Sequence, residues 1–364
     1  MLNSKAFQAA LWVLLIFLII LVGTNISFIF RPIVVLISTI FFPVLIAGIL
    51  YYLTSPIVNW LHSKRIPKGL AILIIYIVLL GILTITILYI GPIIQFQLLN
   101  LIENAPRFLN QLHRTFIDFQ ESAIFERFQE TDSFERWRTV DYAAEVEKFV
   151  STAIDQTYYL IGFITNILII FITIPFILFY MLKDGHKLPK AIVKYLPSKY
   201  QDEGLEILAQ MNKTISSFIQ GQLIVSFFVG FMVYLAYMII GLDYALLLAL
   251  IAMVTNVVPY FGPIIGTIPG MIVGLIQSPW TALQVLFFVF IIQQIESQLI
   301  APQVFGRKLA IHPVTIIVVL LTAGSLAGIL GMILAIPTYA VGKVVVIHVH
   351  SLIKLRMAEG AEEK

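Results

Sequence analysis

A single carboxylate lies within the apolar C-terminal part of the chain, and side-chain amides surround it. Glu296 is the only acidic residue between Asp243 and the C-terminal tail, and it belongs to the segment QQIESQLIAPQVFGRKLAIHP. Gln293 precedes Glu296 by three residues and therefore shares its face on a helix. Because an ionised carboxylate is costly in hydrocarbon, we expect Glu296 to face a cavity, a partner or water. It could be a structural anchor at the membrane interface or a proton or cation site.

A second unusual stretch, NVVPYFGPIIGTIPGMIVG, begins at Asn256. A proline inside a helix removes a backbone donor and clashes with the carbonyl four residues earlier. In lipid, the freed backbone groups need partners from protein, water or a ligand. Pro259 and Pro263, beside Gly262, therefore predict a break that lines a cavity. The pattern fits either a kinked span or a re-entrant hairpin. Together the two stretches supply the candidate substrate- or ion-binding residues Asn256, Pro259, Gly262, Pro263, Thr267, Gln293 and Glu296.

Glycines recur at every fourth position of the broken stretch and again near residue 328. Such spacing places them along one stripe of a helix, where a neighbouring helix can approach closely. The two stripes could pack on each other. The candidate helix-packing residues are Gly266, Gly270, Gly274, Gly324 and Gly328.

Composition and hydropathy define the elements that must position these residues. The chain has 364 residues, of which 60% are hydrophobic and 12% are charged, too few for a soluble protein of this length. A transmembrane helix needs about 20 mostly apolar residues. We predict an all-α polytopic membrane protein with about eight transmembrane helices, one of them broken by proline and glycine. The predicted spans are 7–30, 33–60, 69–94, 156–182, 214–240, 244–275, 280–300 and 313–347.

The predicted regions are an N-terminal membrane region, an insert, a core transport region and a tail, at 1–95, 96–155, 156–348 and 349–364. Lysine and arginine are concentrated after the second and fourth spans and in the tail, which places both termini in the cytoplasm by the positive-inside rule. The insert is then extracytoplasmic. Its apolar residues recur at helical spacing, so it lies over the membrane or a neighbouring subunit, or it forms a gate.

Several chemistries lack their motifs in this sequence. No phosphate-cradling GxxxxGK[ST] loop, zinc-binding HExxH or nucleophilic GxSxG occurs, and cysteine is absent. We therefore expect no enzymatic activity, no catalytic residues, no metal or other cofactor and no nucleic-acid partner.

Four motifs carry a family resemblance: FYMLKDG at 179–185, VVPYFGPIIGTIP at 257–269, IESQLIAPQVFGRKLAIHP at 295–313 and GILGMILAIP at 328–337. In order and spacing they resemble the autoinducer-2 exporter family of bacterial membrane proteins, over about 155–345. Members of that family are linked to export of autoinducer-2 and to sodium- or lithium-for-proton antiport. The resemblance maps the family's motif residues onto Asp184, Pro259, Gly262, Pro263, Glu296, Pro302 and Pro313.

Three functions remain open on this basis. The first is a secondary transporter that exports a small polar metabolite or signalling molecule, such as autoinducer-2, across the bacterial cytoplasmic membrane. The second is a sodium (lithium)/proton antiporter, for which Glu296 is the candidate carboxylate. The third is a non-transporting membrane scaffold. The expected partners are the lipid bilayer, a small-molecule or cation substrate, and further copies of the chain in a homo-oligomer, a pentamer being one candidate.

Overall fold

The computed structural model describes residues 8, 11–15, 17–18, 21, 27–120, 167–306 and 312–362. Within these ranges every regular element is helical and no strand occurs, as expected for an all-α membrane protein. The predicted span 7–30 and the part of the insert from 121 to 155 fall largely or wholly outside the described residues. By length and composition alone, five helical stretches could cross a membrane: Val34–Ser63, Lys68–Asn104, Ser198–Ile239, Pro279–Phe305 and Pro313–Val346.

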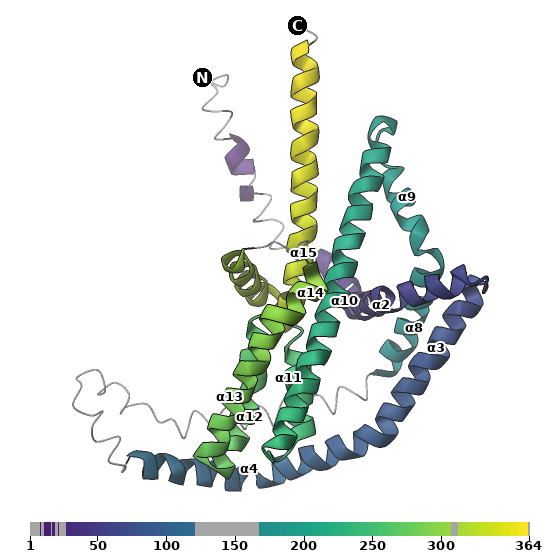
Figure 1. The fold of residues 1–364 in the computed structure, drawn as a ribbon. Coiled ribbons are helices and arrows are strands. Elements are labelled where there is room, and N and C mark those ends of the chain that lie inside the picture. The colour runs from purple at the N-terminus through teal and green to yellow at the C-terminus, as the bar shows by residue number, and fades with distance from the viewer. Residues whose placement is uncertain are drawn as a thin grey trace.

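The N-terminal helices form a small bundle of their own. Helices α2 (Ser27–Ser63), α3 (Lys68–Ile85) and α8 (Ile167–Asp184) pack together, with Ala47, Ile72 and Leu178 among the residues at the centre. Large apolar side chains on the outer side of α3 are exposed, as suits a surface that faces lipid. The chain then continues through η1 (Thr86–Ile90) into α4 (Gly91–Gln120), which runs beneath the second bundle in Figure 1.

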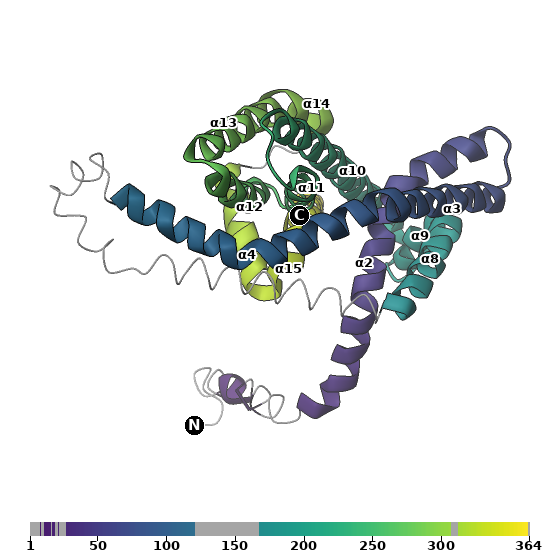
Figure 2. The same cartoon turned by 90° about the horizontal axis from the view of Figure 1, so that it is seen from below.

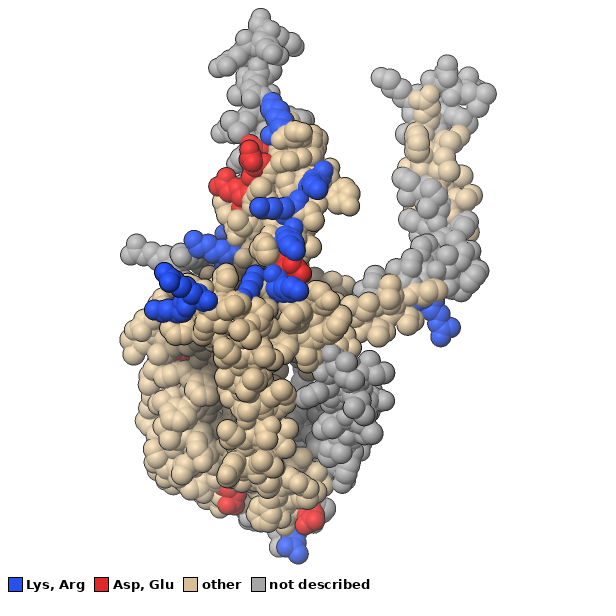
Figure 3. All heavy atoms as spheres, turned by 90° about the vertical axis from the view of Figure 1, so that its right-hand side faces the viewer, with Lys and Arg blue, Asp and Glu red and all other residues tan. Residues whose placement is uncertain are grey.

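The connection after α8 is more helical than a plain loop. It contains η3 (Gly185–Lys187), α9 (Leu188–Val193) and η4 (Ser198–Tyr200). Helix α10 (Gln201–Ile239) then begins well before the predicted span at 214 and carries the chain toward the opposite end of the molecule. Lysine and arginine side chains gather around the α9 end, above a broad band of uncharged surface (Figure 3).

The predicted span 244–275 is a helical hairpin, one of the two alternatives that the sequence left open. Helix α11 (Ala245–Thr255) has 11 residues, which reach only about 16 Å and cannot cross about 30 Å of hydrocarbon. Helix α12 (Phe261–Gln277) folds back against it, so that Gly266 lies beside Ala252. The side-chain amide of Gln277 donates to the Gly241 carbonyl at 3.4 Å, so the two ends of the hairpin lie next to each other.

The predicted single span 313–347 also folds differently. Helix α15 (Pro313–Glu362) is interrupted at Ala327 and at Gly328, whose φ of 58° and ψ of −143° suit glycine. Gly324 faces Met332 across this break, and Gly331 faces Ala323, so the chain folds back on itself at this point. The helix is therefore not continuous across 313–347, because a change of backbone direction takes the place of one more helical turn.

The second bundle combines α10, the α11–α12 hairpin and α13 (Pro279–Ile295) around one core. Val229, Val233 and Tyr237 of α10 lie at its centre with Leu248 of α11 and Val285 of α13. Seen from below, α4 crosses this bundle near the hairpin and extends beyond it (Figure 2).

Helix α4 also caps the hairpin. The first amides of a helix have no partner within the helix. The side-chain oxygen of Gln97 accepts such a bond from the Leu247 amide at 2.9 Å. The part of the insert that the structure describes is thus attached to the start of α11.

The hairpin can be tested with Asp243→Cys and Gln277→Cys, since both residues are exposed and the chain has no cysteine. A membrane-impermeant thiol reagent should label both variants from the same side of the membrane. Tyr195→Cys, at a residue 92% exposed in the turn between α9 and η4, ahead of the other end of α10, should be labelled from the opposite side and serves as the control. Labelling of the two hairpin positions from opposite sides would mean that 244–275 crosses the membrane once.

Candidate functional site

A cavity of about 600 Å³ lies where the turn of the α11–α12 hairpin faces α13 and η5 (Glu296–Ile300). We call it the polar cavity, because amides, hydroxyls and one carboxylate line it together with aromatic side chains. Its lining residues are Phe218, Gln222, Asn256, Pro259, Tyr260, Pro263, Phe290, Gln293, Gln294, Glu296, Ser297, Ala301, Pro302, Phe305, Gly306, Ile316 and Ile336.

The hairpin turn is short and strained. The Phe261 amide donates to the Pro259 carbonyl at 2.8 Å, which closes a three-residue turn around Tyr260. Tyr260 has φ 64° and ψ −46°, close to the rare γ-turn geometry that L-residues adopt only at a cost. The turn brings the two arms so close that a Cβ on Gly262 would meet the Thr255 carbonyl. Strained backbone of this kind is concentrated at functional sites.

A buried amide attaches the hairpin turn to α10. The Gln222 side chain, 6% exposed, donates through Nε2 to the Asn256 carbonyl at 2.7 Å. Asn256 is itself buried and ends α11, where carbonyl groups lack helical partners. The sequence interpretation did not include Gln222. An amide within the apolar span 214–240, two residues after Gln220, was the signal that could have identified it.

The opposite wall contains a π-helical turn. In η5 the Ala301 amide donates to the Glu296 carbonyl, five residues earlier, and Pro302 follows directly. Since proline lacks an amide hydrogen and crowds the carbonyl four residues before it, the wider turn lets the helix continue into α14 (Ala301–Phe305). The same arrangement occurs in η1, where the Gly91 amide donates to the Thr86 carbonyl ahead of Pro92.

Glu296 is the only carboxylate among the residues that line the polar cavity. It is half-buried, as is Gln293. Within the described part of the chain, no ion pair involves Glu296. The cationic residues nearest to it in sequence, Arg307 and Lys308, lie outside the described residues.

The structure brings five of the seven candidate binding residues together around the polar cavity: Asn256, Pro259, Pro263, Gln293 and Glu296. The other two lie within the hairpin. Gly262 is the close crossing point of the two arms. Thr267 donates its hydroxyl to the Pro263 carbonyl at 2.6 Å, inside α12.

The glycines of α12 face three different partners. Gly266 lies against α11, where a Cβ would come within 2.8 Å of the Ala252 Cα. Gly270 faces the Tyr237 hydroxyl of α10, and Gly274 faces Ala282 of α13. The stripe therefore does not pack on the glycines of α15, because Gly324 is used between the arms of that helix and Gly328 forms its turn.

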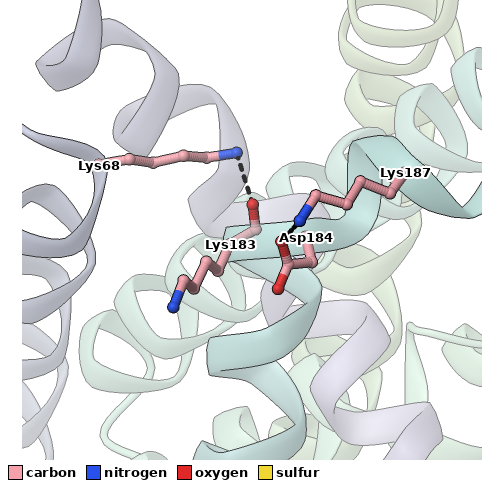
Figure 4. A network of polar contacts seen from close by, with 4 residues as sticks. All are labelled: Lys68, Lys183, Asp184 and Lys187. Carbon is pink, nitrogen blue, oxygen red and sulfur yellow. Dashed lines mark hydrogen bonds and ion pairs between the residues drawn. The ribbon is translucent and has the colours of Figure 1, made fainter.

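The remaining motif residues lie apart from one another. Pro302 lines the polar cavity, and Pro313 is the first residue of α15. Asp184 ends α8 and is not among the cavity residues; its carboxylate pairs with Lys187 at 2.6 Å (Figure 4). Beside it, the Lys68 ammonium donates to the Lys183 carbonyl at 3.0 Å and joins α3 to the end of α8. Among the described residues, no cluster of three or more histidine, cysteine or acidic side chains could hold a metal ion.

A bundle of apolar helices with a broken hairpin around a polar cavity is the architecture of a membrane transporter. Comparison with known proteins agrees. The sequence matches the family described as "AI-2E family transporter" over residues 8–351. It is 42% identical to the "Putative transport protein YueF" of Bacillus subtilis, over 100% of this chain and 98% of the relative.

Two further relatives point the same way. The chain is 34% identical to the "Putative transport protein YrrI" of Bacillus subtilis, over 95% of this chain and 97% of the relative. It is 29% identical to the "Putative permease PerM" of Escherichia coli, over 84% and 86%. The chain belongs to the AI-2E transporter family and is a multi-pass membrane transporter.

Gly266→Leu tests the packing of the hairpin. The larger side chain meets the backbone of α11, so it should lower the stability of the detergent-purified protein by about 1–3 kcal/mol. Gly81→Leu is the matched control, since Gly81 is exposed on α3 and a Cβ there meets nothing within 4 Å. Equal unfolding temperatures for the two variants would show that α12 does not need its glycine.

Proposed function

We propose that the protein is a secondary transporter that exports a small polar metabolite or signalling molecule, of the autoinducer-2 kind, across the bacterial cytoplasmic membrane. The observation that carries this proposal is the polar cavity between the hairpin turn and the π-helical turn. Its volume of about 600 Å³ falls within the usual range for small-molecule sites. The absence of a phosphate-cradling loop favours a gradient over ATP as the energy source, and we propose no enzymatic activity.

The chemistry of the cavity suits a neutral solute rich in hydroxyl and carbonyl groups. Asn256, Gln293 and Gln294 each offer an amide that can both donate and accept hydrogen bonds. Tyr260 and Phe290 add aromatic surface for the apolar face of such a solute. In this proposal Gly262 and Thr267 maintain the shape of the hairpin and do not touch the substrate.

Glu296 is the reason that a cation/proton antiporter is the second candidate function. A carboxylate beside a turn with unwound backbone can bind a cation or take up a proton. A carboxylate beside a cavity also favours both transport functions over a non-transporting scaffold, in which Glu296 would act only as a structural anchor.

The two hairpins bear on orientation. We propose that each replaces one predicted crossing, so that the number of crossings stays even and both termini lie on the same side of the membrane. We propose that this side is the cytoplasm. In this proposal α13 returns toward the cytoplasm. Arg307 and Lys308 are then on the same side of the membrane as the lysine-rich 183–213 segment, in agreement with the positive-inside rule.

We also propose that the protein acts as a homo-oligomer, a pentamer being one candidate. Helix α4 supports this proposal, because it extends beyond its own bundle (Figure 2), where a neighbouring subunit could cover it.

Counterflow into proteoliposomes tests the function directly. Vesicles loaded with autoinducer-2 should accumulate labelled autoinducer-2 from outside if it is a substrate, whereas protein-free vesicles should not. Repeating the assay with sodium, lithium or proton gradients separates export from cation exchange. If the protein moves none of these solutes, the result would favour the non-transporting scaffold.

Glu296→Gln tests the role of the carboxylate. The amide keeps the shape and most hydrogen bonds of the side chain but cannot ionise, so the variant should fold like the wild type and lose the dependence of flux on pH. Glu206→Gln removes an exposed carboxylate of α10 and should keep the wild-type profile. The measurement is flux against pH with matched amounts of protein in the vesicles. Overlapping profiles for Glu296→Gln and the wild type would remove Glu296 from the mechanism.

A further inference from the structure

Three successive residues of α10 contact three different elements. Gln220 donates through Nε2 to a backbone carbonyl of α2 at 2.7 Å. Gly221 lies so close to the Phe305 ring of α14 that a Cβ there would meet it. Gln222 holds the Asn256 carbonyl at the hairpin turn. Because Phe305 and Asn256 both line the polar cavity, this short part of α10 joins α2 to two walls of that cavity.

The acceptor on α2 is the Tyr52 carbonyl, and Pro56 explains why this carbonyl needs a partner from another helix. In a regular α-helix it would accept a bond from the amide of residue 56. Proline has no amide hydrogen, so that bond cannot form. The side chain of Gln220 supplies a donor in its place. The same Nε2 also donates to the Ser216 hydroxyl at 3.1 Å, one turn earlier on α10, which orients the amide.

Tyr52 is held by α10 at a second point. Its hydroxyl donates to Oδ1 of Asn212 at 3.0 Å. Asn212 and Gln220 are eight residues apart, which corresponds to about 12 Å along the axis of α10. Helix α2 belongs to the N-terminal bundle and α10 to the second bundle, and the two helices lie beside each other in Figure 2. One residue of α2 therefore attaches the first bundle to the central helix of the second.

Gln220 and Gln222 bond to elements on opposite sides of α10. Two residues correspond to about 200° around a helix, so α10 stands between α2 and the hairpin turn. Both acceptors are backbone carbonyls, and an unpaired carbonyl is costly in hydrocarbon. Both bonds therefore resist breaking, and a displacement of α2 is passed through α10 to the hairpin turn.

We propose that Gln220 is a positioning residue of the polar cavity: it holds α10 against α2 and thereby sets the separation of the cavity walls that α10 contacts. Gln220 is not among the lining residues, so it acts through Gly221 and Gln222. A movement of the N-terminal bundle relative to the second bundle then widens or narrows the cavity. Its role in transport rests on the proposed function, but the accessibility of the cavity can be measured without a substrate.

The pairing of Gln220 with the carbonyl freed by Pro56 is tested by thermal unfolding of the full-length protein in detergent. Gln220→Met keeps the length of the side chain but removes the donor to Tyr52, so it should lower the unfolding temperature. Pro56→Ala returns a backbone amide to the same carbonyl, so in that background Gln220→Met should lower the unfolding temperature much less. Pro43→Ala, at another proline within α2, should give no such protection. An equal loss in all three backgrounds would overturn the pairing.

The effect on the cavity is tested with Ser297→Cys, because Ser297 lines the polar cavity and the chain has no cysteine. Well below the unfolding temperature, Gln220→Met should raise severalfold the rate at which a thiol reagent modifies this cysteine, since the walls are no longer held together. The rate should rise much less when Gln220→Met is combined with Pro56→Ala. Gln210→Met, which loses a bond only within α10, is the matched control and should leave the rate unchanged.

A second reporter separates a change at the cavity from a general loosening of the protein. Tyr195→Cys lies far along the chain from the cavity residues and is already exposed, so Gln220→Met should not change its rate of modification. An unchanged rate at Ser297→Cys, or an equal rise at both cysteines, would overturn the positioning role. Neither experiment measures flux, so a protein that moves none of the proposed solutes would refute the proposed function and leave these results as they are.

Discussion

Backbone hydrogen bonding inside a membrane is the constraint on which this structure depends. Each unpaired amide or carbonyl in hydrocarbon costs several kcal/mol, so a helix can turn back there only if the protein supplies partners. The α11–α12 turn meets this requirement in two ways. The amides of Phe261 and Gly262 donate to carbonyls within the turn, at Pro259 and Val258. The Asn256 carbonyl receives the side chain of Gln222. The bond from α10 thus fixes the turn, and the turn forms a wall of the polar cavity.

The two hairpins also support each other. Val258, at the turn of the first hairpin, packs with Leu320 and Ala335 from the two arms of the second. The first hairpin is in turn capped at its start by Gln97 of α4. A displacement of the α11–α12 turn would therefore also disturb α10, α15 and α4.

The sequence was sufficient to predict the helix break and to select the two stretches that meet around the polar cavity. Proline acts on its own backbone and on the carbonyl four residues earlier, so Pro259 and Pro263 could be interpreted locally. Glu296 was visible because an acid in an apolar segment has few inexpensive environments. The direction of the chain was not predictable, because hydropathy measures the length of an apolar segment and not whether it returns. Gly328 shows the same limit: a glycine at helical spacing looks the same whether it packs against a neighbour or forms a turn with positive φ. Gln222 was missed because its partner, the Asn256 carbonyl, lies 34 residues away and nothing in the sequence links the two.

The π-helical turn at η5 has a consequence for insertions and deletions. A π-helical turn holds one residue more than the same rise of α-helix requires. Deleting one residue between Glu296 and Ile300 would restore regular α-helical winding only by moving Pro302 into conflict with the preceding turn. If the π-helical turn persisted instead, the missing residue would rotate α14 by about 100°, the angle of one α-helical residue. Phe305, which now stacks on Phe218 with ring centres 6.1 Å apart, would then point away from α10. The length of this segment is therefore as much a part of the cavity wall as its side chains are.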